Sequence, residues 1–338
     1  MSNSSSWLSR LLDFLSQLLG ENAPQPIAQP PPINTILTPM QPRVLIIVFN
    51  PIIDASSGKT LIEEMRWNDP EKLAQGYIDD VRECSGGLVN YRIVDRITAN
   101  EFPMKADEFQ YTAQSYLNVC RTGQGAHDPD NVDYHNIIAK FNLIQRVANN
   151  EIDEVWMFGA PYFGFWESTM AGRNAFFLNS APVMNTDSCP RRFAIMGFNY
   201  ERGVGEMLED LGHRTEFTLQ QVFRRVPRSA NSFERFLRYD QIAPGQANVG
   251  TVHFAPNSLD DYDWGNPTPV QSCADDWLKF PNLPNPPNYR TMTTNDWGNG
   301  DIRGHHKWWL THLPKAAGET GGISNNWWWY VVDPNNVT

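Results

Sequence analysis

Two glutamates and a histidine follow apolar runs that are typical of buried strands, and together they could do acid–base chemistry. These residues are Glu167, Glu201 and His253. Because ligands bind beyond the carboxyl ends of parallel strands, we expect the three side chains to converge at one edge of a sheet. The aromatic neighbour Trp166 would raise the pKa of Glu167, whereas Arg202 would keep Glu201 ionised. Two carboxyl groups with separated pKa values are what glycoside cleavage requires.

This pattern predicts a role for each member of the set. Glu167 would be the general acid and Glu201 the base or nucleophile. Arg202 would be the electrostatic partner of Glu201, and His253 would orient groups or shuttle a proton. The competing interpretation is that each residue is a local helix cap or salt bridge.

The residues around this set predict a surface for a small molecule or glycan. Tryptophan-rich walls suit sugar rings, whose apolar faces stack on aromatic side chains, although tryptophans also serve ordinary packing. The sequence therefore favours a hydrolase that acts on a carbohydrate or glycoconjugate. The residues expected to contact the substrate are Asn50, Tyr162, Trp166, Asn257 and Trp264.

A divalent metal site is the alternative chemistry, and no other cofactor is expected. His305 and His312 are seven residues apart, so they share one face if this segment is helical. With His253 and the aspartates near it they could hold a cation and support a metal-dependent hydrolase. No HExxH or other specific spacing occurs, so hydrogen-bonded structural histidines are the competing interpretation. The aspartates concerned are Asp260, Asp261 and Asp263.

Motifs of other enzyme classes are incomplete. The run from Ser57 to Thr60 is similar to the end of a phosphate-binding loop, but Ile53 stands where that loop needs glycine. The Gly203-Val-Gly205 pair lacks the third glycine of a dinucleotide fingerprint. No GxSxG occurs, which argues against an α/β-hydrolase nucleophile.

Apolar runs that alternate with helical patterns predict the elements that position these residues. Such alternation indicates an α/β fold with a mostly parallel, doubly wound sheet like those of flavodoxin or Rossmann domains. The predicted strands are Val44–Phe49, 88–97, Glu154–Gly159, Arg192–Phe198 and Asn248–Phe254, and the predicted helices are Pro70–Cys84, Val132–Asn149 and Gly203–Leu211, the last ended by Gly212.

The pattern changes near residue 255. Most of the tryptophans lie beyond this point, among many Asn, Asp, Pro and Gly residues. We expect an α/β domain over 43–255 and a loop-rich, Trp- and Asn-rich cap over 256–338 that packs on it. A short helix near His305–Leu313 and a last strand near Trp327–Val332 are expected within the cap.

The first 42 residues form two further predicted segments. Residues 1–20 predict an amphipathic helix, and residues 21–42 a proline-rich linker. The apolar stripe over residues 7–19 could dock on a protein partner, a membrane surface or its own domain. The second function hypothesis follows from it, namely a non-catalytic binding or assembly protein recruited through this helix.

Composition narrows the class of protein. A net charge of −11 argues against nucleic acid as a partner. No apolar run is long enough to cross a bilayer, and the first 20 residues do not look like a signal peptide, so we expect a cytoplasmic protein. The four cysteines form no CxxC pair and are expected to be reduced thiols.

Overall fold

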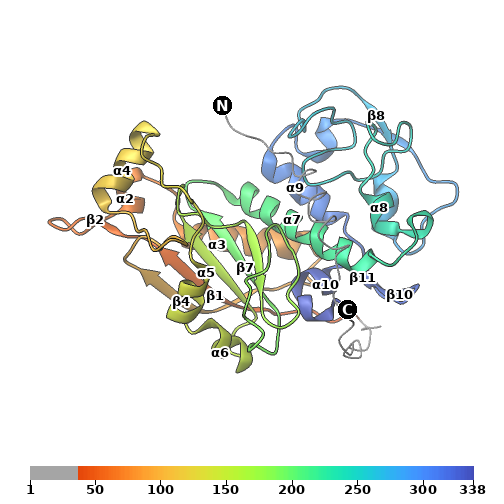
Figure 1. Cartoon of the computed structure of the whole chain (residues 1–338). Coiled ribbons are helices and arrows are strands. Elements are labelled where there is room, and N and C mark those ends of the chain that lie inside the picture. The colour runs from red at the N-terminus through yellow and green to blue at the C-terminus, as the bar shows by residue number, and fades with distance from the viewer. Residues whose placement is uncertain (1–36) are drawn as a thin grey trace.

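A five-stranded mixed sheet forms the centre of the computed structural model, which describes residues 37–338 (Figure 1). The strand order is β4-β1-β5-β7-β6, and all neighbouring pairs are parallel except β6 with β7. The prediction of an α/β fold with a mostly parallel sheet is confirmed. The strands are β1 (Arg43–Phe49), β4 (Arg92–Ala99), β5 (Glu154–Gly159), β6 (Ser168–Ala171) and β7 (Phe193–Asn199).

Helices cover both faces of this sheet. On one face Tyr77 of α3 (Pro70–Cys84) packs edge-on against Trp156 of β5. On the other face Phe49 of β1 packs against Phe141, which follows α5 (Tyr134–Lys140). Burial on both faces explains why β1 and β5 are continuous apolar runs. The other helices are α2 (Leu61–Met65), α4 (Ala113–Thr122), α6 (Leu143–Ala148), α7 (Val204–Phe223), α8 (Ser232–Phe236), α9 (Ile302–Thr311) and α10 (Trp328–Val332).

Within the described residues, three short two-stranded sheets lie outside the central one. They are β2 (Ile52–Asp54) with β3 (Lys59–Thr60), β8 (Val270–Ser272) with β9 (Arg290–Met292), and β10 (Lys315–Thr320) with β11 (Ile323–Asn326).

Two elements predicted from the sequence differ from those in the structure. The predicted helix over 132–149 is two helices, because Asn142 between them adopts a left-handed conformation. The predicted last strand near 327–332 is the helix α10.

Helix α7 is longer than predicted, and it positions most of the candidate site. The sequence predicted its end at Gly212, but α7 continues to Phe223. A Cβ atom at Gly212 would lie 2.6 Å from Cγ2 of Val252, so this glycine serves a close helix–loop contact rather than a helix stop. Figure 1 shows α7 running between the sheet and the C-terminal residues, where it contacts α9.

We expect Gly212→Ala to destabilise the protein by about 1–3 kcal/mol, because the new methyl group overpacks against the stiff Val252 side chain. Urea unfolding followed by tryptophan fluorescence measures this. In a Val252→Ala background the clash is removed, so adding Gly212→Ala there should cost less than half of what it costs in the natural chain. An equal cost of Gly212→Ala in both backgrounds would contradict this explanation.

The predicted strand over 248–254 was wrong, and its backbone is held in another way. Gly250 has a φ of +89°, which a strand does not accommodate. The carbonyl of Gly250 accepts a hydrogen bond from Nε1 of Trp309 at 3.0 Å, and the amide of Val252 donates to Oε1 of Glu216 at 3.0 Å. Side chains from α7 and α9 therefore make the hydrogen bonds that a neighbouring strand would otherwise make with this backbone.

The tryptophans after residue 255 are largely buried in the same hydrophobic core as the sheet. Trp277 and Trp327 pack around Phe236, and Trp309 joins them from α9. Helix α9 lies where the sequence predicts a helix near 305–313. Loops and short helices dominate this part of the chain. Because its tryptophans belong to the same cluster as the strands, it shares its core with the α/β elements. The buried tryptophans are Trp156, Trp264, Trp277, Trp297, Trp309, Trp327 and Trp328.

The predicted N-terminal helix over 1–20 and most of the linker lie outside the described residues. Within residues 37–338, no helix is both long and apolar enough to cross a membrane. Cys84, Cys120, Cys189 and Cys273 are all free thiols.

Candidate functional site

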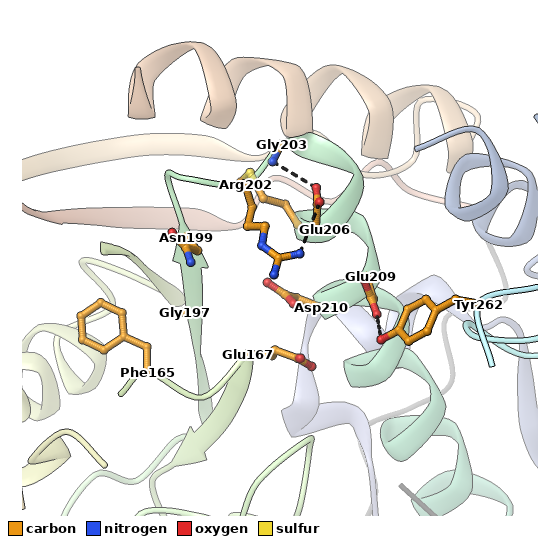
Figure 2. Close-up of a pocket in the computed structure, with 11 residues that line it drawn as sticks. Phe165, Glu167, Gly197, Asn199, Arg202, Gly203, Glu206, Glu209, Asp210 and Tyr262 are labelled. Atoms are coloured by element: carbon orange, nitrogen blue, oxygen red, sulfur yellow. Dashed lines mark hydrogen bonds and ion pairs between the residues drawn. The ribbon is translucent and has the colours of Figure 1, made fainter. Parts of the chain in front are cut away.

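A pocket of about 330 Å³ opens where β7 ends and α7 begins (Figure 2). Gly197 and Asn199 of β7 form one wall, and a Cβ atom at Gly197 would lie 2.3 Å from the carbonyl oxygen of Trp166. The loop before β6 thus approaches the strand closely and brings Glu167 into the pocket. The lining residues are Phe165, Glu167, Gly197, Asn199, Arg202, Gly203, Glu206, Met207, Glu209, Asp210 and Tyr262.

Two imidazoles and a carboxylate converge behind one wall of this pocket, which Glu209 lines and the two histidines do not. Glu209 and His213 are four residues apart on α7, so they share one face of the helix. Oε1 of Glu209 lies 3.1 Å from Nε2 of His253 and 3.9 Å from Nε2 of His213. The three side chains are buried, and one ligand atom of each lies within 4.8 Å of the others. Tetrahedral Zn²⁺ with bonds of about 2.0–2.1 Å separates its ligand atoms by about 3.3 Å. The 3.1 Å spacing is close to this value, and the 3.9 Å spacing would have to shorten on binding.

His253 reaches this cluster because neighbouring side chains fix its loop. Nε2 of His305 lies 3.0 Å from the carbonyl oxygen of Val252, and the amide of Val252 is bound by Glu216. Burial lowers the pKa of His305 well below its usual value, so its ring is neutral and donates that hydrogen bond. His305 is therefore a positioning residue for the loop.

Each histidine of the cluster faces a second carboxylate through its other nitrogen. Nδ1 of His253 lies 2.8 Å from Oδ1 of Asp261, close but not aligned for a hydrogen bond. Nδ1 of His213 lies 3.6 Å from Oε2 of Glu216. Histidines that bind metals usually have such an outer carboxylate, which fixes the ring and its tautomer. Both nitrogens of each ring thus face negative charge, although a neutral imidazole carries one proton only.

The electrostatics of the cluster favour positive charge between the rings. Burial alone would lower the pKa of His213, but the carboxylates of Glu216, Glu167 and Glu209 outweigh it and raise the pKa to about 9. Burial also opposes the ionised form of Glu209, but hydrogen bonds from His253 and Tyr262 help to lower its pKa to about 2. The hydroxyl of Tyr262 donates to Oε1 of Glu209 at 2.8 Å.

Glu167 and Asp210 line the pocket near this cluster. Oε2 of Glu167 lies 4.0 Å from Nε2 of His213 and accepts a hydrogen bond from the Asn179 side chain. Burial, followed by the charges of Glu167, Glu209 and Glu206, raises the pKa of Asp210 well above its usual value. Figure 2 shows both carboxylates directed into the pocket.

The structure brings only part of the predicted catalytic set together. Glu167 and His253 belong to the same group of side chains, linked by His213 and Glu209. Glu201 does not line the pocket; its exposed carboxylate lies 3.3 Å from Nε of Arg202. Arg202 does line the pocket, and its Nη1 lies 3.9 Å from Glu206.

The five residues predicted to contact substrate lie outside the pocket lining. Asn50 accepts a hydrogen bond from the amide of Ile62, at the start of α2. The carbonyl of Tyr162 accepts a hydrogen bond from Lys105, and the side chain of Trp166 is 37% exposed beside the loop. Asn257 donates to the carbonyls of two loop residues, and buried Trp264 stacks on His305.

The predicted metal ligands His305 and His312 are held by backbone carbonyls and do not join the cluster. Nδ1 of His312 lies 2.7 Å from the carbonyl oxygen of Trp308, and its Nε2 lies 3.8 Å from Asp275. Of the three nearby aspartates that the sequence singled out, only Asp261 contacts His253. Asp263 instead accepts hydrogen bonds from Leu259 and Asn266, and Asp260 is exposed.

Sequence reasoning missed Glu209, His213 and Asp210. The signal was present, because Glu209 and His213 have the spacing of one helical turn. Reading Gly212 as a helix stop removed His213 from that helix and hid the pair. The partner of this pair, His253, comes from a loop that the sequence predicted as a strand.

The chain matches no protein-family model, no curated protein sequence and no solved structure. The interpretation of the site therefore depends on its geometry.

Proposed function

We propose that the protein is a metal-dependent hydrolase in which Glu209, His213 and His253 hold one Zn²⁺ ion. The single observation that carries the proposal is the convergence of these three buried donors beside a pocket that Glu209 lines. Two histidines and a glutamate are a known ligand set of catalytic zinc, in which the fourth position stays open for water. The outer carboxylates Asp261 and Glu216 support a metal, because each would accept the Nδ1 proton of a ligating ring.

The surrounding residues can support hydrolysis. Bound zinc lowers the pKa of its water and polarises an acyl or phosphoryl oxygen. Glu167, 4.0 Å from Nε2 of His213, is suited to accept a proton from that water. Tyr262 and Asp261 reach the site from the residues after 255, so we propose that residues 256–338 act as a cap over the pocket. The C-terminal tryptophans are largely buried, so they do not form an exposed aromatic surface. This favours the hydrolase hypothesis over that of an assembly protein that binds partners through such a surface.

Metal analysis and hydrolysis assays of the purified full-length protein test the proposal. We expect metal-free protein to bind one equivalent of Zn²⁺ in isothermal titration calorimetry. A panel of p-nitrophenyl esters, phosphates and glycosides, with a dipeptide amide, should reveal a hydrolysis that chelation abolishes and Zn²⁺ restores. Failure of the metal-free protein to bind Zn²⁺ would end the proposal.

Asp261→Asn should weaken Zn²⁺ binding by about 10–100-fold, since it removes the charge that faces Nδ1 of His253. Calorimetry on the metal-free variant measures the change. Asp260→Asn is the matched control, because Asp260 is the exposed neighbour and makes no contact with the cluster. Equal Zn²⁺ affinity in Asp261→Asn and Asp260→Asn would exclude an outer-carboxylate role.

A carboxylate-pair hydrolase acting on a carbohydrate is the second candidate. It is favoured by one observation, namely that Glu167 and Asp210 line the same pocket and that Asp210 has a raised pKa. In this candidate Asp210 replaces Glu201 as the partner of Glu167. Hydrolysis of an aryl glycoside that persists after chelation and is lost in Glu167→Gln would favour it over the zinc enzyme.

A further inference from the structure

Asp210 is a buried carboxylate for which the protein provides no partner. The residue is 8% exposed, and within residues 37–338 its side chain makes no hydrogen bond and no ion pair. Figure 2 shows its carboxylate directed into the pocket, between Arg202 and Glu167. Because a polar group that is buried without a hydrogen-bond partner is costly, this arrangement points to a ligand group that donates hydrogen bonds to Asp210 and suits an acidic surrounding.

The charge of Arg202 acts on Asp210, but no side chain of the pocket pairs with Asp210 directly. Glu206 accepts a hydrogen bond from the amide of Gly203 at 3.0 Å, so it caps α7. The guanidinium of Arg202 is shared between Glu201 at 3.3 Å and Glu206 at 3.9 Å. Glu209 contacts His253 and His213. Glu167 and Asp210 are therefore the acidic side chains of the pocket that can contact a ligand.

The spacing of these acids suits an organic cation better than a second metal. Among the described residues, only Glu209, His213 and His253 bring three donor atoms within 4.8 Å of one another, so Asp210 belongs to no chelating group. An ammonium group has three N–H donors that point apart and can therefore serve separated acceptors. Phe165 and Tyr262 at the two sides of the pocket offer ring surfaces to the carbon skeleton of such a ligand.

We infer that the substrate carries an ammonium group, which binds between Asp210 and Glu167 while the bond to be cleaved lies toward the Glu209–His213–His253 cluster. The substrate class would thus be amines or amino-terminal compounds. The reaction part of this inference rests on the proposed function, whereas the recognition of the ammonium group does not require zinc.

Ligand-binding measurements on the full-length protein separate these two parts. The probe is benzylamine, with benzyl alcohol and benzoate as neutral and anionic controls of similar shape. We expect saturation-transfer NMR and calorimetry to give benzylamine an affinity at least about tenfold higher than benzyl alcohol, which corresponds to one charge-assisted contact. Because acids rather than zinc hold the ammonium group, the preference should appear in metal-free and in Zn²⁺-loaded protein alike.

Two variants test the residues. Asp210→Asn keeps the shape of the side chain and should reduce benzylamine affinity at least about tenfold, without changing benzyl alcohol binding. Glu167→Gln should also weaken benzylamine binding, and it tests the inference if Asp210→Asn does not fold. Asp187→Asn is the matched control, because Asp187 is exposed and lies outside the pocket.

Each outcome decides between the inferences. Zn²⁺ binding without any preference for benzylamine would overturn the substrate class and leave the proposed function intact. Benzylamine binding without Zn²⁺ binding would overturn the proposed function and leave the recognition of the ammonium group intact. Preference for benzoate would show that Arg202 dominates the pocket and would overturn the inference. Two bound Zn²⁺ ions, one of which is lost in Asp210→Asn, would overturn it in favour of a second metal.

Discussion

His253→Gln should lower the affinity of the metal-free protein for Zn²⁺ by at least about 100-fold. Removing an outer partner alone typically costs 10–100-fold in metal affinity, and loss of one of three protein ligands costs more. The amide of glutamine keeps the polarity of the side chain but offers zinc only a weak oxygen donor. Calorimetry measures the affinity, and any Zn²⁺-dependent hydrolysis should fall with it.

The other histidines provide the controls for this result. His135→Gln removes an exposed imidazole on α5 and should leave Zn²⁺ binding unchanged. His213→Gln should behave like His253→Gln, because Nε2 of each ring faces the same oxygen of Glu209. If His312→Gln abolished Zn²⁺ binding while His213→Gln did not, the metal site would be the one that the sequence first suggested.

The central strands were predictable because burial leaves a local signal. β1 and β5 pack on both faces, so nearly every position is apolar and the run stands out without knowledge of its partners. Segment 248–254 contains buried valines for a different reason. Val249 and Val252 are buried, the latter against Gly212 of α7, and the backbone hydrogen bonds go to Trp309, Glu216 and His305. Composition alone does not distinguish these two kinds of burial.

Two residues of the candidate site were predictable from the sequence, and two were not. Glu167 and His253 were expected near one edge of the sheet, and both lie at the pocket or its cluster. The residues that join them, Glu209 and His213, depend on α7 continuing through Gly212. That continuation is decided by the contact of Gly212 with Val252, about 40 residues further along the chain, which no local pattern reveals.

Arg214 shows that the burial of a charged side chain is equally hard to predict from the local sequence. Its position in an arginine-rich stretch predicts a solvated helix face. In the structure it is fully buried and lies 2.8 Å from Glu154 at the start of β5. Glu154 in turn accepts a hydrogen bond from Nε1 of Trp156, and Arg214 donates to the carbonyl of Val332. The partners that permit its burial come from two separate parts of the chain, β5 and α10.

Arg214→Met should destabilise the protein by about 3–5 kcal/mol, because it leaves the Glu154 carboxylate buried without its counter-charge. Urea unfolding followed by tryptophan fluorescence measures the loss. The surface variant Arg96→Met is the control: its partner Glu71 is about half exposed, so the cost should stay below about 1 kcal/mol.

The double variant Arg214→Met/Glu154→Gln identifies the cause of that loss. Glutamine removes the buried charge and can still accept the hydrogen bond from Trp156, so the double variant should be more stable than Arg214→Met alone. If it were less stable, lost packing of the arginine stem rather than an unpaired charge would explain the effect. Since Arg214 directly follows His213 on α7, Zn²⁺ affinity should fall in Arg214→Met and recover in the double variant. The buried ion pair would then fix the helix that carries two of the three ligands.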